Sequence, residues 1–195
     1  LTGVMLNGND ARQLGLLDAL LGDNDYQQLM QALVNLPAQS QSDTLSKAQS
    51  LIQGMESKAA SEVQTSDLDS HRHYIIEALQ QPDLASIVAS LGLLKGRGKW
   101  LDKAIRTMEH GSPTSLHLIY RAFNMNFTTV DDALLQEYVL AVNATRLGEF
   151  KEGVRALLID KDRTPNWRYT SVETTPKAWI DQFFSTDDMV PAQFL

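Results

Sequence analysis

The chain has 195 residues, no cysteine, and 24 acidic against 17 basic residues, for a net charge of −7. The lack of cysteine excludes a disulfide framework, a thiolate metal site and a cysteine nucleophile within these residues. No apolar run approaches the roughly 20 residues that cross a bilayer. An acidic chain without a long basic stripe also argues against nucleic acid as the main partner.

The first third of the chain predicts little regular structure apart from helices. Leu17 to Leu21 is the best strand candidate and it is short. Apolar residues from Tyr26 to Leu33 repeat at helical spacing, and Pro37 ends that pattern. Residues 37–69 are rich in Gln, Ser and Ala and lack aromatic residues, which indicates a loosely packed helix between loops or a partly mobile linker.

The rest of the chain predicts a series of amphipathic helices. One enters through Pro82-Asp83, and another runs from Trp100 to a stop near Gly111. Ser112 is then an N-cap with Pro113 at the first helical position. The apolar side chains of that helix are expected on one face: Leu116, Ile119, Tyr120 and Phe123.

The longest helix is expected from about Val130 to Leu147, with Gly148 ending it. Its inward residues should be Leu134, Leu135, Tyr138, Val139 and Val142. A last helix opens at Thr175-Pro176 and should bury Trp179, Ile180, Phe183 and Phe184. The fold class predicted is therefore mainly α, with at most one or two short strands.

The stretch from Glu149 to Trp167 carries unusual charge. It begins at helical spacing, and Pro165 ends any helix just before itself. Two lysines, two arginines, two aspartates and two glutamates lie within it, too many for an ordinary packing helix. These residues predict a charged helix end that runs into a turn anchored by Trp167, at a boundary where something else docks.

The same residues carry a resemblance to a known family. The segment EGVRALLIDKDRTPNW, residues 152–167, resembles the C-terminal motif of the 3-hydroxyisobutyryl-CoA hydrolases, a branch of the crotonase (enoyl-CoA hydratase/isomerase) superfamily. The opening LTGVMLNGNDARQLGLLDALL, residues 1–21, and the helix start at Ser112 to Leu116 resemble two further family segments in the same order.

The resemblance implies the organisation of the chain. Residues 1–36 would be the end of the crotonase core, residues 37–69 a helical insertion or linker, and residues 70–195 a C-terminal helical domain. In crotonases the oxyanion hole and the acidic residues precede the Leu-Thr-Gly element. The chain is therefore expected to be a C-terminal part, an all-α fragment that is inactive alone and has no catalytic residue, metal ligand or cofactor of its own.

Lys161 is the candidate for binding coenzyme A. Crotonases place a lysine of a C-terminal helix near the CoA phosphates and the adenine, and Lys161 is its nearest match here. The alternative, which the residues favour, is that Lys161 and Arg163 pair with Glu152, Asp160 and Asp162. Arg155 is expected to form an ion pair with the main domain. The loop from Lys95 to Lys99 could cradle a phosphate but is more typical of a solvated loop.

The resemblance implies a parent enzyme that converts 3-hydroxyisobutyryl-CoA and water to 3-hydroxyisobutyrate and CoA, a step of valine catabolism. An enoyl-CoA hydratase or isomerase paralogue and a non-catalytic helical interaction module are the alternatives. The expected partners are the acyl-CoA, bound through the other half of the protein, and a homo-oligomer, with no nucleic acid and no membrane. The expected location is the cytoplasm in a bacterium or the mitochondrial matrix in a eukaryote.

Overall fold

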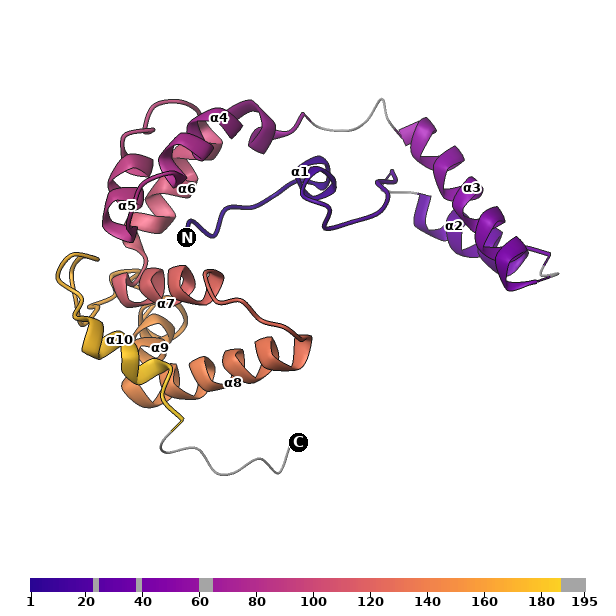
Figure 1. Ribbon diagram of the computed structural model, residues 1–195. Coiled ribbons are helices and arrows are strands. Elements are labelled where there is room, and N and C mark those ends of the chain that lie inside the picture. The colour runs from indigo at the N-terminus through magenta and orange to yellow at the C-terminus, as the bar shows by residue number, and fades with distance from the viewer. Residues whose placement is uncertain (23–24, 38–39, 60–64, 187–195) are drawn as a thin grey trace. The chain divides into compact units, whose positions relative to one another are not determined.

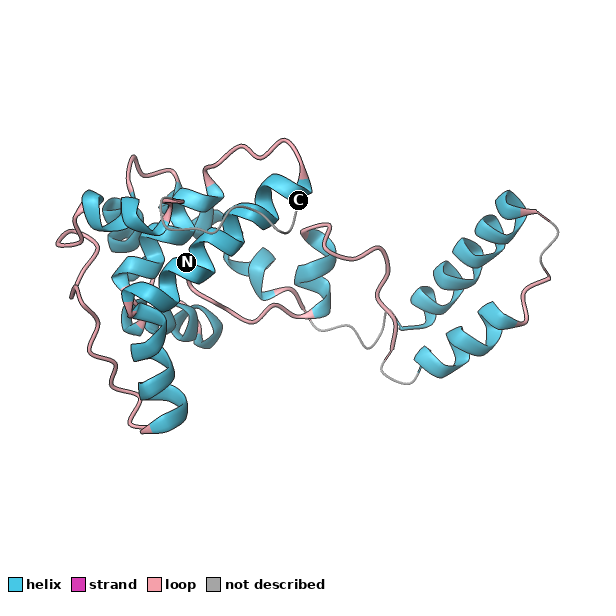
Figure 2. Cartoon of the chain, turned by 90° about the horizontal axis from the view of Figure 1, so that it is seen from below, coloured by secondary structure: helices cyan, strands magenta, loops and turns pink. Residues whose placement is uncertain are grey.

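The computed structural model describes residues 1–22, 25–37, 40–59 and 65–186, and its regular elements in these ranges are all helical (Figures 1 and 2). The mainly α class is confirmed. The chain forms two compact units, one of Val4–Ile75 and one of Leu1–Gly3 with Ile76–Leu195. Helix α4 (Asp67–Leu79) begins in one and ends in the other. Within the described ranges, no helix is both long and apolar enough to cross a membrane.

The unit of Val4–Ile75 contains α1 (Gly8–Gln13), α2 (Asp25–Val34) and α3 (Gln41–Ala59). Helices α2 and α3 lie side by side as a hairpin in both views (Figures 1 and 2). Helix α3 fills much of the segment 37–69, where a loosely packed helix was expected. Residues 38–39 and 60–64 of that segment lie outside the described residues.

The short strand predicted at Leu17 to Leu21 is wrong, because these residues have no regular secondary structure. The backbone N–H of Leu20 donates to Glu56 Oε1 of α3 at 3.0 Å. A side chain of a neighbouring helix therefore satisfies a donor that a strand would have used in a ladder.

Two helix starts in this unit share one buried carboxylate. Asp10 is fully buried and accepts hydrogen bonds from the backbone of Asn7 at 2.9 Å and of Leu68 at 3.0 Å. Asp10 also accepts from Ser66 Oγ at 2.7 Å, and Ser66 Oγ in turn accepts from the backbone N–H of Asp69. The start of α1 is thereby joined to the start of α4.

The second unit contains the remaining helices: α5 (Leu84–Gly92), α6 (Lys99–His110), α7 (Pro113–Phe123), α8 (Val130–Leu147), α9 (Glu149–Val154), the π-helical turn η1 (Arg155–Ile159) and α10 (Lys177–Phe183). The predicted ends of α7 and α8 are confirmed. Ser112 Oγ caps α7 by accepting from Ser115 N at 3.1 Å. Gly148 ends α8 at φ +94°, a backbone conformation that favours glycine.

One core cluster of this unit lies around α10, which packs against α7 and α8 (Figure 1). Trp179, Ile180 and Phe183 are buried, as predicted, and Phe184 is partly buried. The buried amide of Asn143 in α8 donates to the carbonyl oxygens of Phe183 and Ser185, at 3.1 and 2.9 Å. Asn143 therefore caps the C-terminal end of α10.

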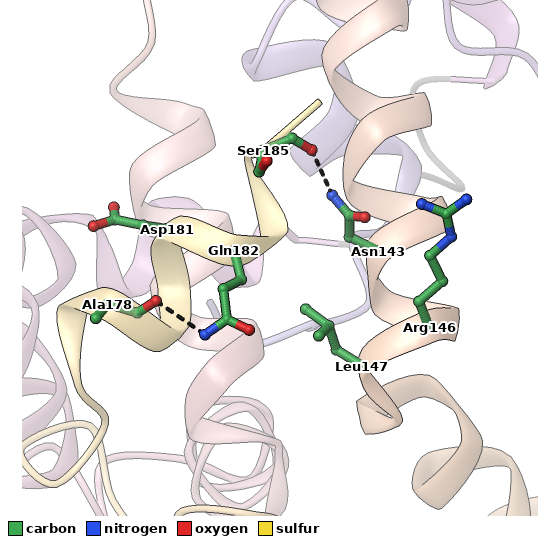
Figure 3. Close-up of a pocket in the computed structure, with 7 residues that line it drawn as sticks. All are labelled: Asn143, Arg146, Leu147, Ala178, Asp181, Gln182 and Ser185. Atoms are coloured by element: carbon green, nitrogen blue, oxygen red, sulfur yellow. Dashed lines mark hydrogen bonds between the residues drawn. The ribbon is translucent and has the colours of Figure 1, made fainter. Parts of the chain in front are cut away.

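An open groove with a volume of about 450 Å³ lies beside this cap, between α8 and α10 (Figure 3). Arg146 and Leu147 line it from α8, and Asp181 and Gln182 line it from α10. The amide of Gln182 donates to the carbonyl of Ala178 at 3.2 Å, within α10. Asp181 pairs with Arg121 of α7 at 2.6 Å, so both helices hold this polar wall.

The expected inward face of α8 is partly wrong. Val139 is buried, but Leu134, Leu135 and Tyr138 are each more than half exposed. The same holds on α7, where Leu116 is buried while Phe123 is 89% exposed. A larger set of exposed side chains on α7, α8 and their connection forms what we call the apolar surface: Phe123, Phe127, Val130, Leu134, Leu135 and Tyr138. Periodicity identifies an apolar stripe correctly, but nothing within the described residues covers this part of it.

Candidate functional site

The candidate site is the loop from Asp160 to Trp167, which follows α9 and the π-helical turn η1. The turn places the backbone N–H of Asp160 on the carbonyl of Arg155 at 2.8 Å, one residue beyond the usual helical partner. The backbone N–H of Arg163 then donates back to the carbonyl of Ala156 at 3.0 Å. The chain therefore folds back over the end of its own helix.

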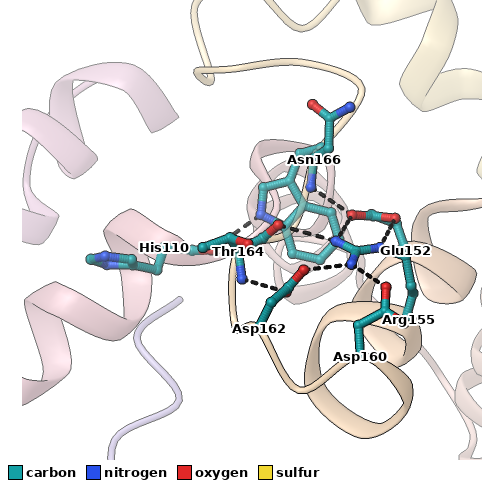
Figure 4. Close-up of polar contacts among 8 residues, drawn as sticks. His110, Glu152, Arg155, Asp160, Asp162, Thr164 and Asn166 are labelled. Atoms are coloured by element: carbon teal, nitrogen blue, oxygen red, sulfur yellow. Dashed lines mark hydrogen bonds and ion pairs between the residues drawn. The ribbon is translucent and has the colours of Figure 1, made fainter.

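Arg155 is the centre of this loop (Figure 4). Its Nε and Nη2 donate to the two carboxylate oxygens of Glu152 at 3.0 and 2.8 Å. Its Nη1 donates to Asp160 Oδ2 and Asp162 Oδ2, each at 2.7 Å. Nη2 also donates to the carbonyl oxygen of Thr164 at 3.1 Å. All five N–H donors of the guanidinium are thereby used.

The ion pairs shift the pKa values of Glu152, Asp162 and Arg155 in the expected directions. Hydrogen bonds from Arg155, and then from the backbone N–H of Asn166 at 2.6 Å, lower the pKa of Glu152 to about 2. Hydrogen bonds from Arg155 and the backbone of Thr164 also lower the pKa of Asp162. The carboxylates raise the pKa of Arg155 further above its ordinary value. Glu152, Asp162 and Arg155 are therefore ionised at neutral pH, which suits a structural role rather than proton transfer.

The interpretation that Lys161 and Arg163 pair with the acidic residues is wrong, because Arg155 holds Glu152, Asp160 and Asp162 instead. Arg155 was expected to pair with the main domain, yet its partners lie in its own loop. Lys161 and Arg163 are exposed, and their side chains have no partner among the residues that the structure describes. Both have left-handed backbones, at φ +56° and +57°. The loop therefore presents two free cations in a strained, fixed backbone.

Trp167 closes the loop at its far end. Its Nε1 donates to the carbonyl oxygen of His110 at 3.1 Å, which ties the loop to the end of α6. Its ring lies so close to Gly153 that a Cβ atom there would meet Trp167 Cη2 at 3.3 Å. The expected Trp anchor is present, and Gly153 provides the space for it.

A second carboxylate fixes the start of α9. The buried Glu149 accepts from Ser112 Oγ at 2.5 Å and from the backbone N–H of Arg168 at 3.3 Å. Ser112 also caps α7, so this carboxylate joins α7, α9 and the segment that follows Trp167.

Two histidines of the chain lie against backbone carbonyl oxygens. His117 Nε2 lies 2.9 Å from the carbonyl oxygen of Val172, and His71 Nδ1 lies 2.7 Å from that of Asp67. In the part of the chain that the structure describes, no group of three His, Asp or Glu side chains could hold a metal ion. The chemistry that the loop can offer is therefore recognition of an anion by Lys161 and Arg163.

Comparison with known proteins agrees with this architecture. The sequence profile of the enoyl-CoA hydratase/isomerase family matches residues 1–184. Over 195 aligned residues, 96% of this chain and 48% of the relative, the chain is 29% identical to the mitochondrial 3-hydroxyisobutyryl-CoA hydrolase of Danio rerio. Over 91 residues, 45% of this chain and 22% of the relative, it is 32% identical to the small ribosomal subunit protein mS47 of Arabidopsis thaliana.

A solved structure gives the same fold. The crystal structure of a carnitinyl-CoA dehydratase from Mycobacterium thermoresistibile aligns with a TM-score of 0.73 at 21% identity, covering 96% of this chain and 50% of that one. The chain thus spans about half the length of the mitochondrial hydrolase and of this dehydratase. Through the match over residues 1–184, this chain belongs to the enoyl-CoA hydratase/isomerase family and is related to the 3-hydroxyisobutyryl-CoA hydrolases.

Proposed function

We propose that the chain is the C-terminal part of an acyl-CoA thioester hydrolase that acts on 3-hydroxyisobutyryl-CoA in valine catabolism. Water adds to the thioester carbonyl, the carbon–sulfur bond breaks, and the CoA sulfur leaves as a thiol after taking a proton. Water is the only co-reactant, so the reaction needs no further cofactor. The observation that carries the proposal is the 29% identity to a hydrolase of that name across 195 aligned residues.

In this proposal the catalytic residues lie in the half of the relative that this chain does not cover. This part supplies shape: it caps the active site, lines the acyl pocket and offers the apolar surface for contact with the other half or with a second subunit. An apolar surface that contains Phe123 at 89% exposure is unusual for a part that works alone. The parent enzyme would work in the mitochondrial matrix of a eukaryote or the cytoplasm of a bacterium.

Lys161 is proposed to contact the phosphates or the adenine end of CoA. Its charge is not neutralised by the neighbouring aspartates, because Arg155 already binds both of them. The left-handed backbone at Lys161 is held in place by the bonds on either side of it. Because the backbone is already fixed, only the side chain of Lys161 must be ordered on binding a phosphate, which favours affinity.

The second candidate function is a non-catalytic interaction module. The similarity to mS47, whose name places it in a ribosomal subunit, supports it over 45% of this chain. A non-catalytic module would keep the loop around Arg155, since the ion pairs of that loop stabilise the fold independently of any reaction.

The test is CoA release from 3-hydroxyisobutyryl-CoA, followed by thiol colorimetry, for this chain and for the full-length product of its gene. Release by the full-length protein alone supports the proposal. Release by this chain alone would mean that the residues around Glu149 to Trp167 are catalytic. If neither releases CoA, water addition to an enoyl-CoA separates a hydratase paralogue, which adds water, from an interaction module, which does not.

A further inference from the structure

Helix α6 carries four basic side chains on one face: Lys99, Lys103, Arg106 and His110. At 3.6 residues per turn they fall within an arc of about 60° around the helix, along roughly 16 Å of its length. All four are exposed, while Leu101, Ile105 and Met108 on the opposite face are buried. We call these four residues the cationic ridge.

The acidic residues nearest to the ridge are turned away from it. Asp102 and Glu109 stand three or four positions from Lys99 and Arg106, where helix neighbours usually pair. Instead, Asp102 Oδ1 accepts from the backbone N–H of Gly96 at 2.7 Å, and Glu109 Oε1 pairs with Lys95 Nζ at 2.7 Å. The loop before α6 therefore takes both acidic side chains away from the ridge.

The cations of the ridge differ in this respect from several others in the chain. Lys47, Arg121 and Lys177 each hold a carboxylate within 2.8 Å. Lys99, Lys103 and Arg106 have no ion pair within the described residues. The ridge is therefore a positively charged patch without ion-pair partners on a chain whose net charge is −7.

We propose that the cationic ridge binds an acidic helix of a partner protein, with carboxylates spaced at i, i+4, i+7 and i+11 to match it. The Nδ1 of His110 lies 2.8 Å from the carbonyl oxygen of Arg106, which fixes the ring, and Figure 4 shows the ring pointing away from the loop around Arg155. The ridge is straight, one helix long and flanked by the polar Asp102, Thr107 and Glu109. Those dimensions fit a single helix laid along it.

The chemistry of the surroundings favours this partner over other polyanions. The ridge contains no Phe, Tyr or Trp, and the half-buried Trp100 of α6 lies about 60° around the helix from the nearest ridge residue. The net charge of −7 further disfavours nucleic acid as the partner. Its flanks carry Asp102, Thr107 and Glu109 besides the half-buried Trp100, so the ridge lacks the broad apolar face that enters a membrane surface. The proposal does not rest on the enzyme function proposed above.

The test uses the whole chain and a labelled, alanine-rich helical peptide of about 18 residues with glutamates at the four matched positions. Fluorescence anisotropy at low salt measures its Kd. We expect Lys103→Glu with Arg106→Glu to weaken binding about tenfold or more. The matched control reverses two exposed cations elsewhere, Lys151→Glu with Lys177→Glu, and should change the Kd less than about threefold.

Circular dichroism checks that both variants are folded. If the charge-reversed ridge variant is not folded, the neutral pair Lys103→Gln with Arg106→Gln replaces it. Equal weakening by the ridge and control variants would overturn the proposal, because it would show an effect of net charge alone. Equal binding of a peptide with the same composition but shuffled glutamates would also overturn it. So would tighter, ridge-dependent binding of oligouridine or of phosphatidylserine vesicles, which would assign the ridge to nucleic acid or membrane.

Discussion

The indole of Trp167 lies against the backbone of Gly153, so closely that an added Cβ atom would meet Trp167 Cη2 at 3.3 Å. The ring has little freedom to retreat, because its Nε1 donates to the carbonyl oxygen of His110. A glycine inside a helix normally weakens it, and here it is the residue that lets the loop close onto the helix.

Replacing glycine by alanine inside a helix normally stabilises a protein by about 0.5–1 kcal/mol. Gly153→Ala is expected to show no such gain, because the added methyl group presses against the indole of Trp167. In a Trp167→Leu background the same substitution should become stabilising by about that amount, because the contact is gone. Urea unfolding of the four proteins measures this coupling. Equal effects of Gly153→Ala in both backgrounds would mean that the indole does not restrict this position.

Replacing Arg155 should raise the pKa of Glu152 toward its ordinary value. That pKa is about 2 in the folded chain against an ordinary value of 4.5. Because the folded pKa is depressed, its contribution to stability is complete above about pH 4.5 and is lost as the pH falls toward 2. Arg155→Gln should lower the melting temperature by several degrees at neutral pH, with a smaller difference from the native chain near pH 2.

Carboxyl ¹³C shifts of Glu152 measure its pKa directly. The control is Arg121→Gln, which removes a guanidinium from Asp181 and leaves Glu152 with its partners. An unchanged Glu152 pKa in Arg155→Gln would contradict the assignment of the cluster. Arg155→Lys should behave more like the glutamine variant than the native chain, since lysine cannot supply the five fixed donors.

Asp10→Asn should destabilise the unit of Val4–Ile75 by about 1–3 kcal/mol, because an amide turns a donor toward groups that all donate to the native carboxylate. Burial alone would raise the pKa of Asp10, but hydrogen bonds from Ser66, Asn7 and Leu68 outweigh it and lower the pKa. Its stabilising effect is therefore lost only at acid pH, below the ordinary range of an aspartate. Chemical denaturation checks the value, and the exposed Asp18→Asn should stay within about 0.5 kcal/mol of the native chain.

Lys161→Ala, made in the full-length protein, should raise KM for the acyl-CoA several-fold and leave kcat nearly unchanged, because the contact that we propose is with the CoA end and not with the reacting thioester. Lys161→Gly serves as a second variant, since it removes the charge and also relieves the left-handed backbone at φ +56°. Both should raise KM alike. A normal KM in both would remove Lys161 from the CoA site, and Lys151→Ala controls for general charge loss.

The apolar surface should cause self-association of this chain when the rest of the protein is absent. Light scattering should show species larger than a monomer, and an apolar dye should bind. Leu134→Gln with Tyr138→Gln should reduce both signals, with little change in stability because the two side chains are already exposed. Glu137→Gln on the same helix is the control. A monodisperse monomer that binds no dye would count against this use of the surface.

Helix ends were predictable from the sequence because their signals are local. Ser112 with Pro113, and Gly148 after a long apolar repeat, need only neighbouring residues to act. The partners of Arg155 were not predictable. Asp160 and Asp162 reach Arg155 because a π-helical turn and the left-handed residues Lys161 and Arg163 reverse the chain. No sequence pattern predicts a π-helical turn or a left-handed conformation at a non-glycine residue.

The exposed residues of α8 illustrate a different limit. Leu134 and Tyr138 have the spacing of a buried face, and spacing reports the apolar stripe whether or not its cover is part of the chain. The strand prediction at Leu17 to Leu21 was wrong for a related reason, since a short apolar run is compatible with several backbone structures. Here the backbone N–H of Leu20 bonds to Glu56, a residue distant in sequence, instead of to a neighbouring strand.

The Glu149 carboxylate has a consequence for how this part of the molecule loses its structure. Its two oxygens serve two segments, Ser112 at the start of α7 and the backbone of Arg168, while its own backbone begins α9. Opening any one of the three strips a buried partner from the others. These segments, distant in sequence, therefore behave as one cooperative unit that opens as a whole, and local fraying at one of them is suppressed by the other two.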